Sequence, residues 1–266
     1  MIAQIGGATI GYDDVGEGAP VVFLHAFPLN RTMWAPQTSA LAADWRCIAI
    51  DFRGFGESAA ASPFTMDRYA DDVAELLDFL DVRRAIVVGL SMGGYVAFSL
   101  WRRHAPRIRA VVLADTRSGA DSPETRERRH ELMALARDAG VGAVVDRQLV
   151  GLLGKSTRER KPEIERAMRA TAASATVDGI VGALEAMLGR PDSTATLETL
   201  AIPTLIIVGD EDVITPPKEA RAMQAATPGS RLELLANAGH LSSVERPAAF
   251  NALVSEFLHD VEAGEL

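Results

Sequence analysis

Short, uninterrupted apolar runs recur along the chain and predict buried strands. A strand in a parallel sheet is covered on both faces, so it is typically a continuous apolar run rather than an alternating one. Six runs of strand length fit this description: residues 21–25, 47–50, 85–89, 110–114, 204–209 and 231–235. We therefore expect a mostly parallel sheet whose strands are buried on both faces.

Helical patterns separate these runs. Residues 66–80, 92–104 and 245–258 carry apolar stripes at three- and four-residue spacing, as helices packed on a sheet do. Alternating strands and helices predict an α/β fold with helices on both faces of the sheet. Residues 2–14 alternate only loosely and contain Gly6-Gly7, which predicts an antiparallel hairpin at the sheet edge.

The alternation stops between residues 116 and 200. This stretch has no convincing strand but has helix-like patterns at 124–138, 159–172 and 177–188. No Ser/Gly-rich linker divides the 266 residues, so one core domain with an insertion is the simpler organisation. We expect a core formed by residues 1–115 and 201–266, and a helical cap formed by residues 116–200.

Composition narrows the classes of function. The net charge is −9 and no basic stripe is interleaved with aromatics, which argues against a nucleic-acid partner. No apolar run is long enough to span a bilayer, and residues 1–11 lack a basic segment followed by an apolar one, so we expect a cytoplasmic protein without membrane contact. Cys47, the only cysteine, lies in an apolar run and is expected to be a buried, inert thiol.

The predicted cap differs in charge from the core. Residues 117–190 hold thirteen Arg or Lys against eleven Asp or Glu, a net +2 that leaves −11 for the remainder. Solvated helix faces with ion pairs between successive turns explain most of this excess. Steering of an anionic substrate is the alternative.

The pentapeptide Gly89-Leu90-Ser91-Met92-Gly93 carries the clearest chemical signal. A G-x-S-x-G pattern between a strand and a helix is typical of a sharp turn that lifts a serine hydroxyl clear of the sheet. The same turn places the Met92 N–H at the start of the helix, where it can stabilise a developing negative charge. An incidental serine in a glycine-rich turn is the alternative for the pattern alone.

Four other segments accompany the pentapeptide in chain order. They are His25-Ala26-Phe27-Pro28, Asp51 to Ser58 with Gly54 and Gly56, Gly209-Asp210-Glu211-Asp212 with Pro216, and Gly239-His240. With these segments the chain resembles the α/β-hydrolase superfamily, in its lidded esterase and lactonase branch. The resemblance covers the whole length apart from the cap, and it implies a Ser-His-Asp mechanism without metal or cofactor.

The resemblance assigns roles residue by residue. His240 is the expected base for Ser91, because it alone of the five histidines lies in a loop that can reach over the sheet. Asp212 is the expected acid from the spacing of Gly209 and Pro216, while Asp115, at the end of an earlier strand, is the rival.

A second oxyanion donor is expected from the backbone N–H of Phe27, although Ala26 departs from the family's usual glycine. The segment 51–58 is expected to be a supporting turn, with Arg53 as an internal ion-pair partner.

The expected reaction is hydrolysis of carboxylic esters of small to medium acyl chains through an acyl-enzyme. Lactone hydrolysis of the 3-oxoadipate enol-lactonase type is the first alternative; carbon–carbon bond hydrolases, perhydrolase or haloperoxidase relatives and low-turnover ligand receptors share the scaffold. The oligomeric state stays open. The cap is expected to give the small-molecule pocket an aliphatic face from Met133, Leu149, Leu152, Leu153 and Met187.

Overall fold

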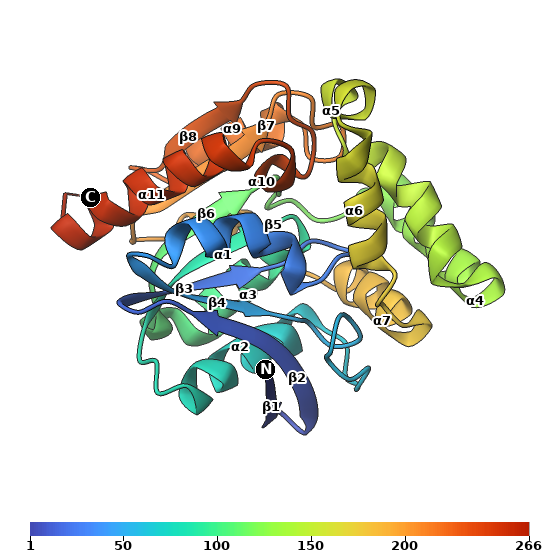
Figure 1. Cartoon of the computed structure of the whole chain (residues 1–266), viewed down its shortest axis with the longest axis horizontal. Helices are drawn as coiled ribbons and strands as arrows, with labels where there is room; N and C mark the ends of the chain where they lie inside the picture. The colour runs from blue at the N-terminus through green and yellow to red at the C-terminus, as the bar shows by residue number, and fades with distance from the viewer. Residues whose placement is uncertain (266) are drawn as a thin grey trace.

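The computed structural model describes residues 1–265 and contains one eight-stranded sheet (Figure 1). Its strands lie in the order β1-β2-β4-β3-β5-β6-β7-β8, and only the pairs β1–β2 and β2–β4 are antiparallel. The strands are β1 (Ile2–Ile5), β2 (Ala8–Val15), β3 (Ala19–Leu24), β4 (Trp45–Ile50), β5 (Ala85–Leu90), β6 (Ile108–Ala114), β7 (Thr204–Gly209) and β8 (Arg231–Leu235). The predicted mostly parallel α/β sheet is confirmed.

All six apolar runs form strands, and residues 2–14 form the predicted edge hairpin. The expectation of full burial is wrong for β8. This strand pairs with β7 alone and is mostly half-buried, with Leu234 43% exposed. A strand at the sheet edge has a neighbour on one side only, so its side chains keep part of their contact with solvent.

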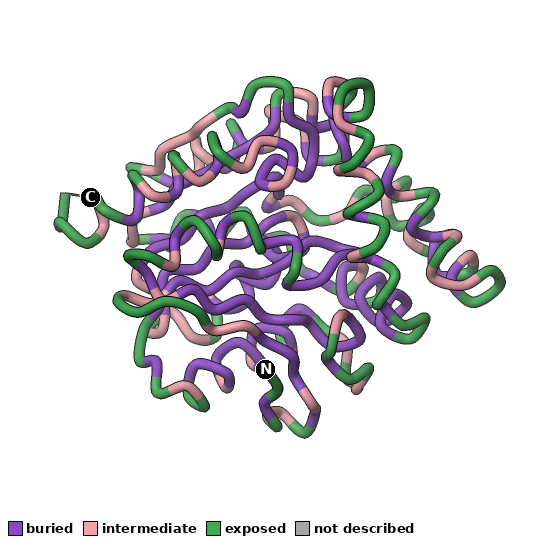
Figure 2. The backbone as a smooth tube through the Cα atoms, viewed as in Figure 1, coloured by how far each residue is buried: buried purple, intermediate pink, exposed green. Residues whose placement is uncertain are grey.

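Helices cover both faces of the sheet because the strand side chains alternate between two cores. In β3, Val22 and Leu24 join the core under α2 (Met66–Phe79), α3 (Met92–His104) and α9 (Pro217–Ala226). Val21 and Phe23 join the opposite core, under α1 (Ala35–Leu41) and α11 (Pro247–Ala263). The central strands are accordingly buried along their length in Figure 2.

Between β6 and β7 the chain is helical and lies beside one end of the sheet (Figure 1). The predicted helix 124–138 is confirmed as the first half of α4 (Pro123–Leu152), which consists of two helices that meet at Gly140, where φ is 80° and ψ is 179°. The predicted helix 159–172 is two helices, α5 (Lys155–Arg160) and α6 (Pro162–Ala172), because Pro162 starts a new first turn. The third, α7 (Val177–Leu188), has the predicted bounds.

Four short elements complete the structure of residues 1–265: η1 (Arg31–Trp34), η2 (Ala105–Arg107), α8 (Thr194–Leu197) and α10 (Ser242–Glu245). Across these residues no helix is long and apolar enough to cross a membrane. The loops that follow β3, β5, β7 and β8 leave the sheet at the carboxyl ends of parallel strands. Ligand sites of open α/β sheets form at that edge.

Candidate active site

Ser91 lies at a strained turn between β5 and α3. Its φ is 54° and its ψ is −112°, outside the regions that L-residues ordinarily adopt. The flanking glycines are required by close packing, since a Cβ at Gly89 would lie 2.5 Å from the Gly93 carbonyl oxygen and one at Gly93 would overlap with the Leu24 carbonyl. Thr116 fixes the turn by donating its hydroxyl to the Ser91 carbonyl at 2.8 Å.

His240 brings the loop after β8 to this serine. Its Nε2 lies 2.7 Å from the Ser91 hydroxyl oxygen, and its Nδ1 lies 2.8 Å from Asp212 Oδ2. The imidazole is buried, which by itself lowers its pKa, but the carboxylate of Asp212 outweighs this and raises the pKa above its usual value. Two hydrogen bonds therefore connect hydroxyl, imidazole and carboxylate in one line.

Asp212 is held by three donors besides His240. Its Oδ1 accepts the backbone N–H groups of Ile214 (2.8 Å) and Thr215 (3.0 Å), and its Oδ2 accepts the Thr215 hydroxyl at 2.8 Å. Burial alone raises the pKa of Asp212, but His240 and these donors hold it below its ordinary value. Thr215 was not expected from the sequence; its place three residues after an acid and next to Pro216 is the only local signal.

Asp115, the rival acid, contacts other groups. Its Oδ1 accepts the Gly209 N–H at 2.9 Å, and its Oδ2 accepts the Ser242 N–H at 3.1 Å and the Ser242 hydroxyl at 2.5 Å. Burial, reinforced by the negative charge of Asp212, raises the pKa of Asp115 well above its usual range. Asp115 therefore ties β6 to β7 and to α10, while the bond to the imidazole is made by Asp212.

The N–H groups of Met92 and Phe27 donate to no other group within residues 1–265. Ala26, which stands where a glycine was expected, has a negative φ and a buried methyl group, so the alanine causes no backbone strain. His25 braces this loop, because its Nε2 accepts the Phe52 N–H at 3.0 Å and its Nδ1 donates to the Ala26 carbonyl at 3.0 Å. Burial lowers the pKa of His25 to about 4, which keeps the imidazole neutral.

Glu245 links the histidine loop to the helices between β6 and β7. Its fully buried carboxylate accepts the N–H groups of Gly239 (2.9 Å) and Leu241 (3.2 Å), on either side of His240. The other oxygen accepts the Gly154 N–H, between α4 and α5, at 2.9 Å. The sequence did not predict this role, since a glutamate near a helix start is ordinarily a solvated capping residue.

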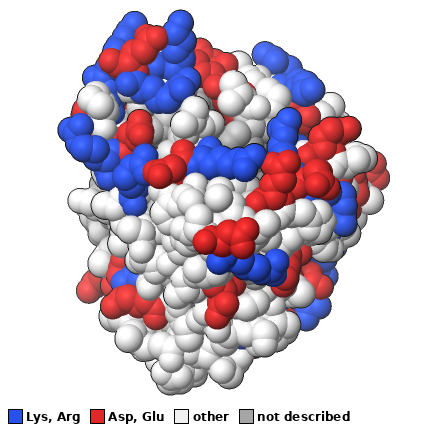
Figure 3. All heavy atoms as spheres, turned by 90° about the vertical axis from the view of Figure 1, so that its right-hand side faces the viewer, with Lys and Arg blue, Asp and Glu red and all other residues white. Residues whose placement is uncertain are grey.

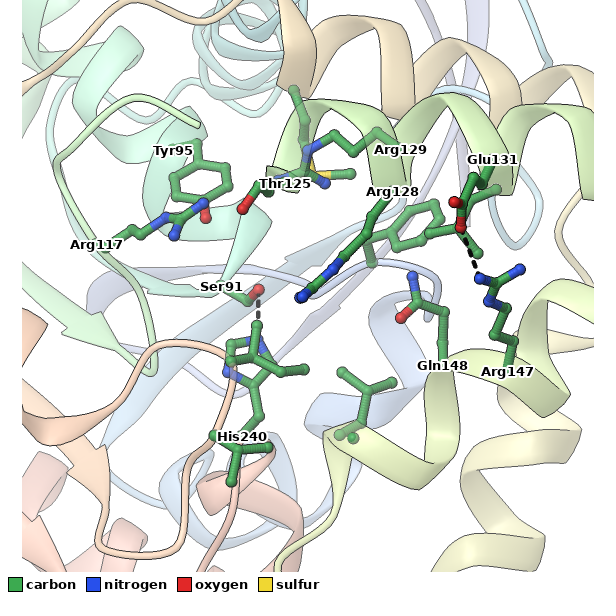
Figure 4. A pocket seen from close by; sticks show the side chains of 17 residues that line it. Ser91, Tyr95, Arg117, Thr125, Arg128, Arg129, Glu131, Arg147, Gln148 and His240 are labelled. Carbon is green, nitrogen blue, oxygen red and sulfur yellow. Dashed lines mark hydrogen bonds and ion pairs between the residues drawn. The ribbon is translucent and has the colours of Figure 1, made fainter. Parts of the chain in front are cut away.

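A cavity of about 600 Å³ opens above Ser91 and His240, beneath α4 (Figure 4). The expected aliphatic face is only partly correct: Leu152 and Met187 line the cavity, whereas Met133, Leu149 and Leu153 pack in the cores. Polar side chains occupy much of the remaining wall, from Arg117, Thr125, Arg128, Arg129, Glu131, Arg147 and Gln148. The Phe27 side chain forms an apolar wall near the serine.

Two supporting expectations are confirmed. Arg53 forms a buried, bidentate ion pair with Asp72, with N···O distances of 2.7 and 2.8 Å. Cys47 is buried, and burial raises the pKa of its thiol to about 12.

Within residues 1–265, no group of three or more His, Cys, Asp or Glu side chains is placed to hold a metal ion.

Comparison with known proteins gives the family. Residues 21–253 match the alpha/beta hydrolase family. The chain belongs to that family. This alpha/beta hydrolase is 38% identical to a thermophilic esterase from Thermogutta terrifontis, solved with malate bound, with a TM-score of 0.93 over 97% of this chain and 96% of that one.

Two enol-lactonases are also similar to this hydrolase. The enol-lactonase from Burkholderia xenovorans LB400 is 31% identical, with a TM-score of 0.91 over 97% of this chain and all of that one. The 3-oxoadipate enol-lactonase 1 of Acinetobacter baylyi is 27% identical over 98% of this chain and 97% of its own length. These three relatives are thus named as one esterase and two enol-lactonases.

Proposed function

We propose that this hydrolase cleaves carboxylic esters by acyl transfer to Ser91. The hydrogen-bonded line from Ser91 through His240 to Asp212 is the observation that carries the proposal. A serine hydroxyl is a weak nucleophile until a base within hydrogen-bond distance removes its proton. The similarity to an esterase of nearly equal length supports the same reaction.

Each residue has one role in the proposed reaction. Ser91 Oγ attacks the ester carbonyl carbon while His240 Nε2 takes the hydroxyl proton, and Asp212 stabilises the imidazolium through Nδ1. The N–H groups of Met92 and Phe27 bind the carbonyl oxygen as it becomes negative. His240 then gives the proton to the departing alkoxide, and an acyl group remains on Ser91.

Water completes the cycle. His240 removes a proton from a water molecule, whose oxygen attacks the acyl carbon, and it returns that proton to Ser91 as the acid leaves. The helices between β6 and β7 act as the cap over this reaction, and the cavity has the size of a site for a small molecule. Lactones are the second candidate substrates, because a lactone is a cyclic ester and enol-lactonases match this chain over nearly its full length.

Hydrolysis of p-nitrophenyl acetate, butyrate and octanoate tests the proposal. Wild type is expected to turn over repeatedly, and Ser91→Ala is expected to lose at least about 10⁴-fold in kcat. Ser39→Ala, at an exposed position of α1, is the matched control and keeps the wild-type rate. Equal rates for wild type and Ser91→Ala would contradict the proposal, as would a single burst of p-nitrophenol without turnover.

A further inference from the structure

Arg128 is an unpaired cation in the wall of the cavity. It lines the cavity together with Ser91, yet it makes no hydrogen bond or ion pair with any of residues 1–265. In Figure 4 its side chain points from α4 toward the part of the cavity where Ser91 and Gln148 lie. Gln148, also in the lining, makes no side-chain hydrogen bond within the same residues.

The other basic groups of the wall are already matched with carboxylates. Arg117 and Arg129 bind Asp121, with N···O distances of 2.8 and 2.5 Å, and Arg147 binds Glu131 at 2.7 Å. Asp121 is nearly buried, and these guanidinium groups hold its pKa at about 2 although burial raises it. Arg128 thus differs from its neighbours: within residues 1–265 it forms no ion pair, and its charge only helps to lower the pKa of the exposed Glu124, one helical turn earlier.

Positive charge remains in excess around the cavity. Asp121 receives Arg190 as a third guanidinium, at 2.9 Å, so one carboxylate faces three cations. Four arginines and one glutamate line the cavity along with apolar side chains, and solvent partly screens the exposed Arg128 and Arg147. Figure 3 shows basic side chains among acidic ones on the molecular face formed by these helices. The interior of the cavity therefore favours an anion.

We propose that the substrate is an ester or lactone carrying a free carboxylate away from its reacting carbonyl, and that Arg128 binds this carboxylate. This inference rests on the proposed function of Ser91 and adds the substrate class. A planar guanidinium suits a carboxylate because it can donate two parallel hydrogen bonds. Gln148 is placed to donate its amide N–H to the same group.

Half esters provide a matched test. Monomethyl succinate, glutarate and adipate are compared with methyl butanoate, pentanoate and hexanoate, which carry a methyl group in place of the carboxylate. Hydrolysis is followed by acid release at constant pH. Wild type is expected to prefer one half ester over its neutral counterpart by about tenfold in kcat/KM, because a solvent-accessible charge-assisted contact is of that strength.

Variants at Arg128 locate the effect. Arg128→Gln is expected to remove the preference by raising KM for the half ester, and Arg128→Lys to restore part of it. Arg137→Gln is the control on the same helix, since Arg137 lies outside the cavity lining and pairs with Glu185. Added salt is expected to weaken the wild-type preference for the half ester and to leave the ratio of kcat/KM values of Arg128→Gln unchanged.

Two outcomes would overturn the inference. Neutral esters could be hydrolysed as well as half esters, or Arg128→Gln could slow both classes equally. If Ser91-dependent hydrolysis of neutral esters persists in either case, the proposed function stands and only the substrate class is wrong. If neither class is hydrolysed, the proposed function fails as well.

Discussion

Asp212→Asn changes one atom of the line of hydrogen bonds and should nearly stop ester hydrolysis. The two backbone N–H groups that reach Oδ1 require an acceptor there, so the asparagine oxygen takes that place. Its NH₂ group then occupies the Oδ2 position, opposite His240 Nδ1. The imidazole must accept that hydrogen bond at Nδ1 and carry its own proton on Nε2, where it can no longer take the Ser91 proton.

The size of the loss follows from the same contacts. Flipping the amide would restore the imidazole but leave two buried N–H groups without acceptors, at about 1–3 kcal/mol each. The productive orientation is then populated at a few per cent or less, because about 1.4 kcal/mol is a factor of ten. We expect kcat to fall by about 10² to 10⁴, the upper figure being that of the corresponding change in a serine protease.

The assay is steady-state hydrolysis of p-nitrophenyl butyrate, with circular dichroism to show that the variants are folded. Asp115→Asn is the matched control, because Asp115 is as buried as Asp212 but its oxygens bind Gly209 and Ser242 rather than His240. Its kcat is expected to stay within about tenfold of wild type. If Asp212→Asn keeps more than a tenth of the wild-type kcat, or if Asp115→Asn is the slower variant, Asp212 is not the acid that orients His240.

Three further predictions concern the supporting structure. The kcat/KM for a neutral ester should rise with pH as His240 becomes neutral, with its midpoint above pH 6.5 because Asp212 raises that pKa; a midpoint below 6.5 in a pH–rate profile would contradict this. Glu245→Gln turns an amide NH₂ toward a backbone N–H such as that of Gly154, so the free energy of unfolding measured in urea should fall by about 1–3 kcal/mol. The midpoint of the pH–rate profile should also fall, because the charge of Glu245 contributes to raising the pKa of His240. Gly93→Ala should lower the thermal midpoint and abolish activity, because the added methyl overlaps with the Leu24 carbonyl; a variant as stable and active as wild type would show that the turn tolerates a side chain.

Local patterns predicted the parts of the fold that depend on neighbouring residues. The apolar runs, the hairpin at Gly6-Gly7 and the turn at Ser91 each combine local conformation with a burial pattern that a short window reveals. The exposure of β8 has two causes. Arg231 and Glu233 make this strand less apolar than the buried strands β5 and β7, which the sequence shows, while its position at the sheet edge is set by distant pairing that no short window reveals.

Contacts between distant segments were harder to predict. The Glu245 carboxylate accepts a hydrogen bond from the N–H of Gly154, 91 positions earlier in the chain, and no local pattern near either residue indicates this contact. The sequence revealed the arginines of the cap only as a small excess of positive charge. Which of them form ion pairs and which do not depends on how α4 packs over the cavity. Asp115 directly follows β6 and Asp212 lies three residues after β7, so both acids lie near the same edge of the sheet. The spacing of Gly209 and Pro216 favoured Asp212, and the hydrogen bond of His240 Nδ1 to Asp212 agrees with that choice.

During ester hydrolysis Ser91 should become covalently bonded to the acyl group. Treatment with an organophosphate such as paraoxon, followed by mass spectrometry of the intact chain and its peptides, tests this directly. Wild type is expected to gain one diethylphosphoryl group on the peptide containing Ser91, with parallel loss of esterase activity, while Ser91→Ala gains none. Labelling at another residue, or full activity in a chain labelled at Ser91, would contradict the account.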